Sequence, residues 1–157
     1  MRVRKLLKSD REAIINIINA TENLTAAERD CAVELLDIYL TNPLQNDYFF
    51  IVATDSSDSP SGYVCYGKTP LTDAVYDLYW ILVDRRLRHK GIGRALLEHT
   101  EEVLKRQGAR MLVAETSGLP AYETARSFYR RSGFAEESRI KDFYKPCDDL
   151  ITFVKRF

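Results

Sequence analysis

The spacing of apolar residues predicts two helices in the first part of the chain. Ser9 and Glu12 have the spacing of a capping box, and isoleucines at helical spacing follow them. Thr25 and Glu28 form a second such pattern, which opens a helix that must end before Pro43. We therefore expect two consecutive helices ahead of the first long apolar run.

The rest of the chain alternates between strand-like and helix-like segments. Aromatic and β-branched residues predict strands over 48–54, 62–68, 74–84, 109–116, 134–144 and 149–157. Amphipathic helices are expected over 91–107 and from about 120 to 133. The inferred order, which begins with a strand ahead of the first helix, is β, α, α, β, β, β, α, β, α, β, β. This order predicts an α/β (α+β) fold with one partly antiparallel sheet, in a single domain spanning residues 1–157.

Composition narrows the class of protein. Among 157 residues, 23 Lys and Arg balance 23 Asp and Glu, and a nucleic-acid-binding protein usually carries a basic surplus. Three cysteines without a C-x-x-C pair, and only two histidines, do not suggest a disulfide framework or a metal site. The N-terminus lacks an apolar signal-peptide core and no run could span a bilayer. We expect a cytoplasmic protein with no nucleic-acid, membrane or metal partner.

The segment with the clearest chemistry joins a long apolar strand to a helix. Arg88, Lys90 and Arg94 surround Gly91 and Gly93 at the start of that helix. Free amides at a helix N-terminus, the helix dipole and glycine's small size together suit a phosphate group. The alternative is an ordinary glycine-containing helix start with solvated charges.

Two common nucleotide motifs fit this segment poorly. A dinucleotide loop needs a third glycine or alanine, and that position holds Leu96. Glu115 lies about 20 residues further on, where such a fold places a ribose-binding acid, but it does not restore the pattern. The Gly-Lys-Ser/Thr of a P-loop is absent.

Two motifs instead resemble those of the GNAT superfamily of N-acetyltransferases. Arg88-x-x-Gly91-x-Gly93 is similar to its acyl-CoA pyrophosphate loop. Ala125-x-x-x-Tyr129 followed by Gly133-Phe134 is similar to its second signature. The resemblance implies a three-layer αβα sandwich with a mixed, centrally splayed sheet of about 6–7 strands. It also implies an N-acetyltransferase that uses acetyl-CoA as cosubstrate and no metal.

The resemblance further implies roles for individual residues. Backbone amides of one loop would hold the pyrophosphate: Arg88, His89, Lys90, Gly91, Ile92, Gly93 and Arg94. The strand residues Ile81, Leu82 and Val83 would pair with the pantetheine arm, one of their amides polarising the thioester carbonyl. Tyr129 would protonate the departing thiolate, although its place on an amphipathic helix also suits a core tyrosine.

The general base has two candidates. In several branches of the family an acidic residue or histidine lies six residues before the position of Val83, and here that residue is Asp77. Glu115, at the end of the next strand, is the rival. Either could take the proton of the acceptor amine, and Asp77 could equally be a plain strand residue. Many relatives carry Asn where this chain has Tyr122, so the hydrogen bond that this Asn makes is not expected here.

The acceptor is not readable from the sequence. Residues 19–41 and 142–149 would select it, and Asp142, Tyr144, Asp148 and Asp149 form either an attraction for a cationic amine or a solvated acidic turn. We expect a small-molecule amine acceptor. A protein acetyltransferase, acting on a terminal or lysine amine, and a non-catalytic acyl-CoA-binding module are the alternatives; homodimerisation is left open.

Overall fold

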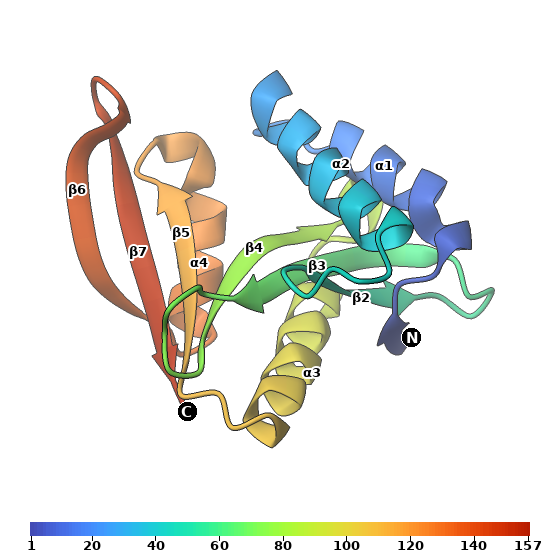
Figure 1. Ribbon diagram of the computed structural model, residues 1–157. Coiled ribbons are helices and arrows are strands. Elements are labelled where there is room, and N and C mark those ends of the chain that lie inside the picture. Colours follow the sequence, from blue (N-terminus) through green and yellow to red (C-terminus); the bar gives the residue numbers. More distant parts are fainter.

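The computed structural model describes residues 1–157 and contains one seven-stranded mixed sheet in the order β1-β2-β3-β4-β5-β7-β6 (Figure 1). None of its four helices combines the length and apolarity that crossing a bilayer requires. Short 3₁₀ turns lie at Lys8–Asp10, Arg85–Leu87 and Pro120–Tyr122. The elements are β1 (Arg2–Lys5), α1 (Arg11–Asn19), α2 (Ala26–Thr41), β2 (Phe49–Thr54), β3 (Pro60–Lys68), β4 (Val75–Val83), α3 (Ile92–Arg106), β5 (Met111–Ser117), α4 (Glu123–Arg131), β6 (Ala135–Lys145) and β7 (Asp148–Arg156).

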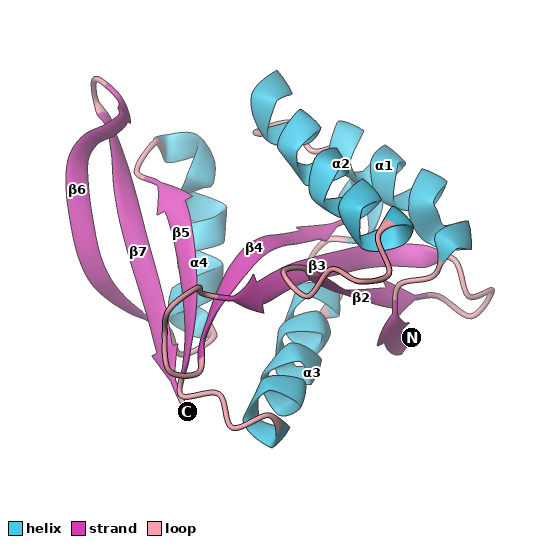
Figure 2. Ribbon diagram, in the orientation of Figure 1, coloured by secondary structure: helices cyan, strands magenta, loops and turns pink.

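Strand alternation divides the apolar residues between two cores. On β2, Phe50 and Val52 pack with α1 and α2, whereas Ile51 and Ala53 pack with α3 and α4. The same division holds on β3, where all but the end residues are buried. Helices therefore cover both faces of the sheet (Figure 2), which confirms the predicted three-layer α/β sandwich and its element order.

One helix start follows the sequence prediction and the other does not. Thr25 accepts from the amide of Glu28 at 3.2 Å while the Glu28 carboxylate accepts from the amide of Thr25 at 2.7 Å, as a capping box requires. The capping box predicted at Ser9 and Glu12 is wrong. Ser9 lies inside a 3₁₀ turn, and Asp10 instead accepts from the amide of Leu7 at 2.8 Å. Asp10 is also buried against Arg4, an ion pair that local spacing does not reveal.

The sheet opens at its centre. The parallel strands β4 and β5 pair over only three positions, from Val75 opposite Met111 to Asp77 opposite Val113. Beyond Asp77, β4 stays paired with β3 while β5 stays paired with β7, so the two halves of the sheet diverge (Figure 1). This divergence is the predicted central splay. It leaves the edge of β4 from Leu78 to Val83 without a neighbouring strand on the side of β5.

Candidate active site

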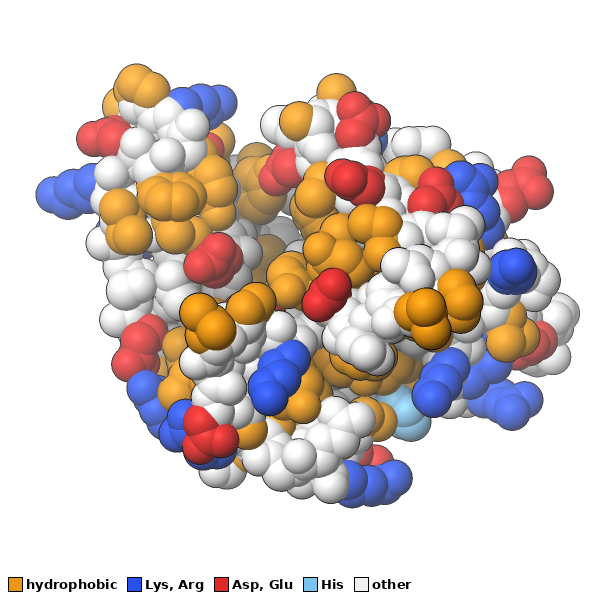
Figure 3. Space-filling model, viewed as in Figure 1, with side chains coloured by type: hydrophobic (Ala, Val, Ile, Leu, Met, Phe, Trp, Pro, Cys, Tyr) orange, Lys and Arg blue, Asp and Glu red, His pale blue; other side chains and the backbone are white.

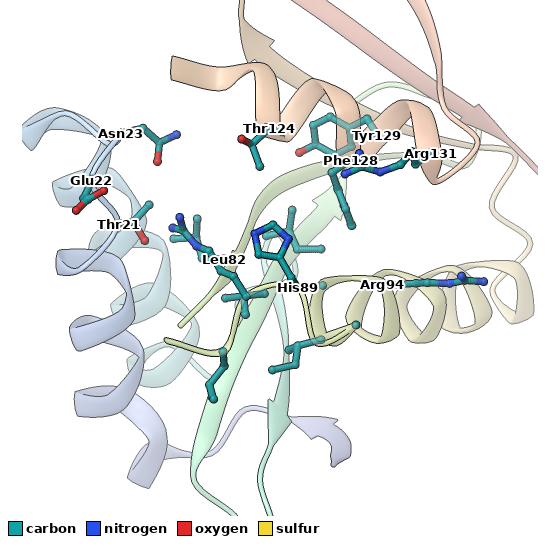
Figure 4. Close-up of a pocket in the computed structure, with 18 of the residues that line it drawn as sticks. Thr21, Glu22, Asn23, Leu82, His89, Arg94, Thr124, Phe128, Tyr129 and Arg131 are labelled. Atoms are coloured by element: carbon teal, nitrogen blue, oxygen red, sulfur yellow. The ribbon is translucent and has the colours of Figure 1, made fainter. Parts of the chain in front are cut away.

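A cavity of about 490 Å³ lies where β4 has left β5. Its walls come from four parts of the fold that are far apart in the sequence: the α1–α2 loop, the end of β4, the loop before α3 and one face of α4 (Figure 4). Nine of the ten residues predicted to bind the cosubstrate line it: Ile81, Leu82, Val83, Arg88, His89, Gly91, Ile92, Gly93 and Arg94. The tenth, Lys90, is exposed and does not line the cavity.

The loop before α3 turns its backbone toward the cavity. His89 and Gly91 both have left-handed backbone conformations, with φ of 62° and 80°. Gly91 is the N-cap of α3, and the amides of residues 91–94 donate no hydrogen bond within the protein. Successive free amides at a helix start form a concave anion-binding surface, so this geometry suits a phosphate group.

The guanidinium groups around this loop differ in how far they are already neutralised. Arg94 donates to Glu98 at 2.7 Å, and Figure 4 shows its side chain directed along α3. Arg88 lines the cavity and forms no ion pair or side-chain hydrogen bond. Arg88 therefore brings an uncompensated positive charge to the free amides.

The open edge of β4 forms the second wall. Ile81 and Val83 pack toward the α3 and α4 core, and Leu82 packs toward the α1 and α2 core. Their backbone groups on the side facing away from β3 have no strand partner. An extended ligand can therefore add to this edge as a further strand would.

Tyr129 reaches the cavity from α4. Its ring packs against Phe134 and Phe153, with centroids 5.4 and 5.5 Å away. Its hydroxyl makes no hydrogen bond within the protein and lies on the Thr124 side of the ring in Figure 4. Burial raises the pKa of the Tyr129 hydroxyl well above its ordinary value, so this group keeps its proton at neutral pH. The ring is a core residue, and the hydroxyl is a donor available to the cavity.

Asp77 and Glu115 lie together at the split, on the face of the sheet that α1 and α2 cover. Neither residue lines the cavity. The residues flanking them, such as Leu78 and Ala114, belong to the α3 and α4 core, so by alternation both carboxylates face the α1 and α2 side. Asp77 accepts from the hydroxyl of Thr69 at 2.7 Å. Partial burial, with the negative charge of Asp77, raises the pKa of Glu115.

Acidic side chains act on Glu115 and on Tyr144. Partial burial, followed by the charges of Glu115, Asp148 and Glu28, raises the pKa of Tyr144. Figure 3 shows the molecular surface hollowed between the lobe of β5–β7 and the lobe of α1 and α2, with acidic side chains on both sides. Near the split, therefore, the charged groups that act on Tyr144 are all carboxylates.

The sequence indicated three aspartates of the β6–β7 turn that could attract a cationic amine, and two of them are bound within the hairpin. Asp149 accepts from Arg139 at 3.1 Å, and Asp142 accepts from the amide of Cys147 at 2.6 Å. Both carboxylates thus serve the hairpin itself. Asp148 is buried and accepts from the Ser117 hydroxyl at 2.5 Å. Of the candidate residues in that turn, Asp148 acts on Tyr144, and the charge of Glu115 also acts on Tyr144.

The α1–α2 loop lies within residues 19–41, the range expected to select the acceptor, but the sequence predicted no individual residue of this loop. Thr21, Glu22 and Asn23 line the cavity although they lie some sixty positions before the phosphate-type loop in the chain. Glu22 forms an ion pair with Arg85, which holds this loop to the end of β4. No periodicity or motif marks the loop, because its role arises from tertiary contacts alone.

Tyr122 ties the same loop to the opposite wall. Its hydroxyl donates toward the carbonyl of Asn23 at 2.9 Å and lies 3.0 Å from the Glu28 carboxylate. The tyrosine that departs from the family pattern thus has a structural partner of its own. We call the contact of Tyr122 with Asn23 and Glu28 the clasp; it bridges the two halves of the molecule across the split.

Side chains able to hold a metal ion are not grouped anywhere in the structure: no three His, Cys, Asp or Glu residues cluster suitably. The three cysteines are unpaired.

Comparison with known proteins agrees with this geometry. The acetyltransferase (GNAT) family model matches residues 12–134. A protein from Desulfovibrio desulfuricans assigned to the GNAT family is 39% identical, with a TM-score of 0.93, over 99% of this chain and 98% of that one. No curated protein matches the chain significantly.

More distant structures share the fold. Ribosomal-protein-alanine N-acetyltransferase from Brucella melitensis is 23% identical, with a TM-score of 0.80 and 100% coverage of both chains. An aminoglycoside 6'-N-acetyltransferase in complex with coenzyme A is 14% identical, with a TM-score of 0.76 over 99% of this chain and 97% of that one. Together with the family match, the open β4 edge and the loop before α3 place this chain in the GNAT family of acetyltransferases.

Proposed function

We propose that this protein transfers the acetyl group of acetyl-CoA to the primary amine of a small cationic molecule, by direct attack when both are bound. One observation carries the proposal. The edge of β4 that opens beyond Asp77 leads directly to the free amides of residues 91–94. A ligand with an extended amide-containing arm and a pyrophosphate matches these two features in the order in which they occur.

The residues present fit acetyl-CoA. The pantetheine arm would lie along Ile81–Val83, and the pyrophosphate would meet the start of α3 beside Arg88. The packing of the protein does not itself require glycine at position 93, because a Cβ there would have only ordinary contacts with Phe128 and Val83, at 3.5 and 3.7 Å. The missing side chain instead leaves the backbone open to a ligand. When bound, acetyl-CoA supplies an acetyl group activated as a thioester.

The side chains on the two faces of the split suit opposite proton transfers. Glu115, with its raised pKa, takes the proton that the attacking amine loses, directly or through a water molecule. Tyr129 gives its proton to the sulfur as the C–S bond breaks and the C–N bond forms, and regains one from solvent. A free β4 amide donates to the carbonyl oxygen as negative charge develops there.

The surroundings of Glu115 favour a cationic acceptor. The negative charge of Asp77 raises the pKa of Glu115, and the negative charges of Asp148 and Glu28 raise the pKa of Tyr144; such charges attract a cation. The clasp at Tyr122 also holds the α1–α2 loop, which lines the cavity, to the segment before α4, and a loop fixed in this way favours a small amine over a protein segment. Protein acetylation is the second candidate, favoured by the exposed Phe143 and Tyr144 of the β6–β7 hairpin.

A panel of amines tests the proposal. The purified protein is incubated with acetyl-CoA and, separately, linear diamines and polyamines, amino acids, aminosugars and a peptide with a free N-terminal alanine, while thiol release is measured. We expect the fastest release with a small amine that carries a second positive charge. Release with the peptide alone would contradict the small-molecule assignment. Binding of acetyl-CoA without release by any amine would instead indicate a non-catalytic acyl-CoA-binding protein.

A further inference from the structure

One buried carboxylate of the protein has no cation beside it. The carboxylates on residues that are more than nine-tenths buried are those of Asp10, Glu101 and Asp148. Asp10 is paired with Arg4 at 2.7 Å, and Glu101 with Lys155 at 2.6 Å. Asp148 forms no ion pair and accepts from the Ser117 hydroxyl at 2.5 Å. Because a buried charge is costly unless it is paired, Asp148 is the buried carboxylate that gains most from a cation supplied by a ligand.

The buried cation in the same region is already bound elsewhere. Arg126 is the one basic residue that is buried, and it donates to the carbonyls of Ser117 and Leu119 at 2.6 and 2.9 Å and to the Glu123 carboxylate at 2.7 Å. The Ser117 hydroxyl, which donates to Asp148, also accepts from the amide of Leu119 at 3.0 Å. These contacts fix the end of β5 and leave the charge of Asp148 uncompensated.

The position of Ser117 relates Asp148 to the proposed base. Glu115 and Ser117 are two positions apart on β5, so their side chains project from the same face of the sheet, about 7 Å apart along the strand. The hydrogen bond from Ser117 holds the Asp148 carboxylate beside the second of these positions. Glu115 itself forms no ion pair. Two carboxylates without a cation therefore follow one another along one face at the split.

Tyr122 and the hollow of the surface lie at the same place. Partial burial, followed by Glu28 and then Asp148, raises the pKa of the Tyr122 hydroxyl, which lies 3.0 Å from the Glu28 carboxylate. Asp148 thus lies close to the clasp, between β7 and α2. Figure 3 shows that the surface is hollowed between these two lobes. A cation that enters this hollow meets carboxylates from both of its walls.

We propose that Asp148 binds a second ammonium group of the acceptor, so that the protein selects a linear diamine over a monoamine with the same carbon chain. This inference rests on the proposed function and names the class of its acceptor. When one amine is at Glu115, an ammonium group about 7 Å further along the same face reaches the position of Asp148. It supplies the charged donors that this carboxylate lacks.

The test compares putrescine, a linear diamine, with butylamine, which has the same carbon chain and one amine. For both, kcat/KM per amine group is measured with acetyl-CoA in the wild type and in Asp148→Asn. We expect the wild type to prefer putrescine by roughly tenfold, since a hydrogen bond to a charged group contributes at least this much. Asp148→Asn keeps an acceptor for Ser117 and removes the charge, so the ratio should fall to about one.

The melting temperature without an amine separates binding from a structural role. Because Asp148→Asn removes an unpaired buried charge, its melting temperature should equal or exceed that of the wild type. A carboxylate that serves only the hydrogen bond with Ser117 would give the opposite pair of results: a lower melting temperature and an unchanged preference for putrescine. That pair of results would overturn the proposal.

Asp149→Asn is the matched control. It removes the same charge at the next position, where the carboxylate is bound by Arg139 and by the amide of Asp142. It should keep the wild-type preference for putrescine. Equal use of both amines by the wild type, or a preference that survives in Asp148→Asn, would overturn the role of Asp148, while acetylation of butylamine would leave the proposed transfer to small amines intact. Thiol release with neither amine nor any other small amine would overturn both.

Discussion

Tyr129 shows how one side chain serves both packing and chemistry. Its ring completes an aromatic cluster with Phe128, Phe134 and Phe153, while its hydroxyl has no partner in the protein. Tyr129→Phe keeps the ring and removes only the proton donor. We expect kcat to fall by about 100-fold, the lower end of a general acid's contribution, with CoA affinity and melting temperature nearly unchanged. An unaltered kcat would show that the hydroxyl is not the acid.

The pair of carboxylates gives a pH-dependent prediction. If Glu115 is the base, kcat/KM rises with pH as Glu115 loses its proton, and Glu115→Gln removes this limb of the profile. Asp77→Asn removes a negative charge that raises the pKa of Glu115, so the limb moves to lower pH. The reverse pattern, a limb lost in Asp77→Asn and shifted in Glu115→Gln, would make Asp77 the base.

At the scale of elements, the two glycines at the start of α3 respond differently to substitution: one is required by the backbone conformation and the other only by the ligand. Gly91 has φ of 80°, so an alanine there is strained whatever it does to binding. At Gly93 a methyl group would have only ordinary contacts, and alanine favours the helix. Gly93→Ala should therefore leave the melting temperature equal or higher and weaken CoA binding by about tenfold, since one methyl blocks the backbone. Unchanged CoA affinity would contradict the loop assignment.

The clasp links two elements that the sequence places far apart. Tyr122→Phe removes the hydrogen bonds to Asn23 and Glu28. We expect a loss of about 1–2 kcal/mol in the free energy of unfolding, because the Glu28 carboxylate loses a donor. We also expect a raised KM for the amine, because the α1–α2 loop lines the cavity. Tyr144→Phe, which removes an exposed hydroxyl without a hydrogen bond, controls for stability; equal melting temperatures would contradict the clasp.

Much at this scale was predictable from the sequence. Hydrophobic periodicity and turn residues predicted the order of helices and strands, and the Thr25 capping box formed as expected. The start of α1 was missed because Asp10 is recruited by Arg4, through an ion pair of 2.7 Å that depends on tertiary packing. A local sequence pattern predicts which nearby side chain can cap a helix, but not whether a distant residue binds that side chain instead.

At the scale of the whole molecule, the split between β4 and β5 decides where the site lies. Its presence followed from family resemblance, and neither strand's own pattern shows that pairing ends after Asp77. The family resemblance likewise pointed to residues 19–41 as a range, but no local pattern singled out Thr21, Glu22 and Asn23 within it. The loop before α3 was predictable, because glycines, cations and a helix start are adjacent in the sequence.

The central claim, that the opened edge of β4 and the start of α3 hold coenzyme A, is tested most directly by thermal unfolding with acetyl-CoA, CoA and NAD in parallel. A ligand that binds only the folded protein raises its stability by about 2.7 kcal/mol at 100 times Kd. We predict that acetyl-CoA and CoA raise the melting temperature, that NAD does not change it, and that Gly93→Ala shows a smaller rise with both CoA species. An unchanged melting temperature with both CoA species at saturating concentrations would contradict it.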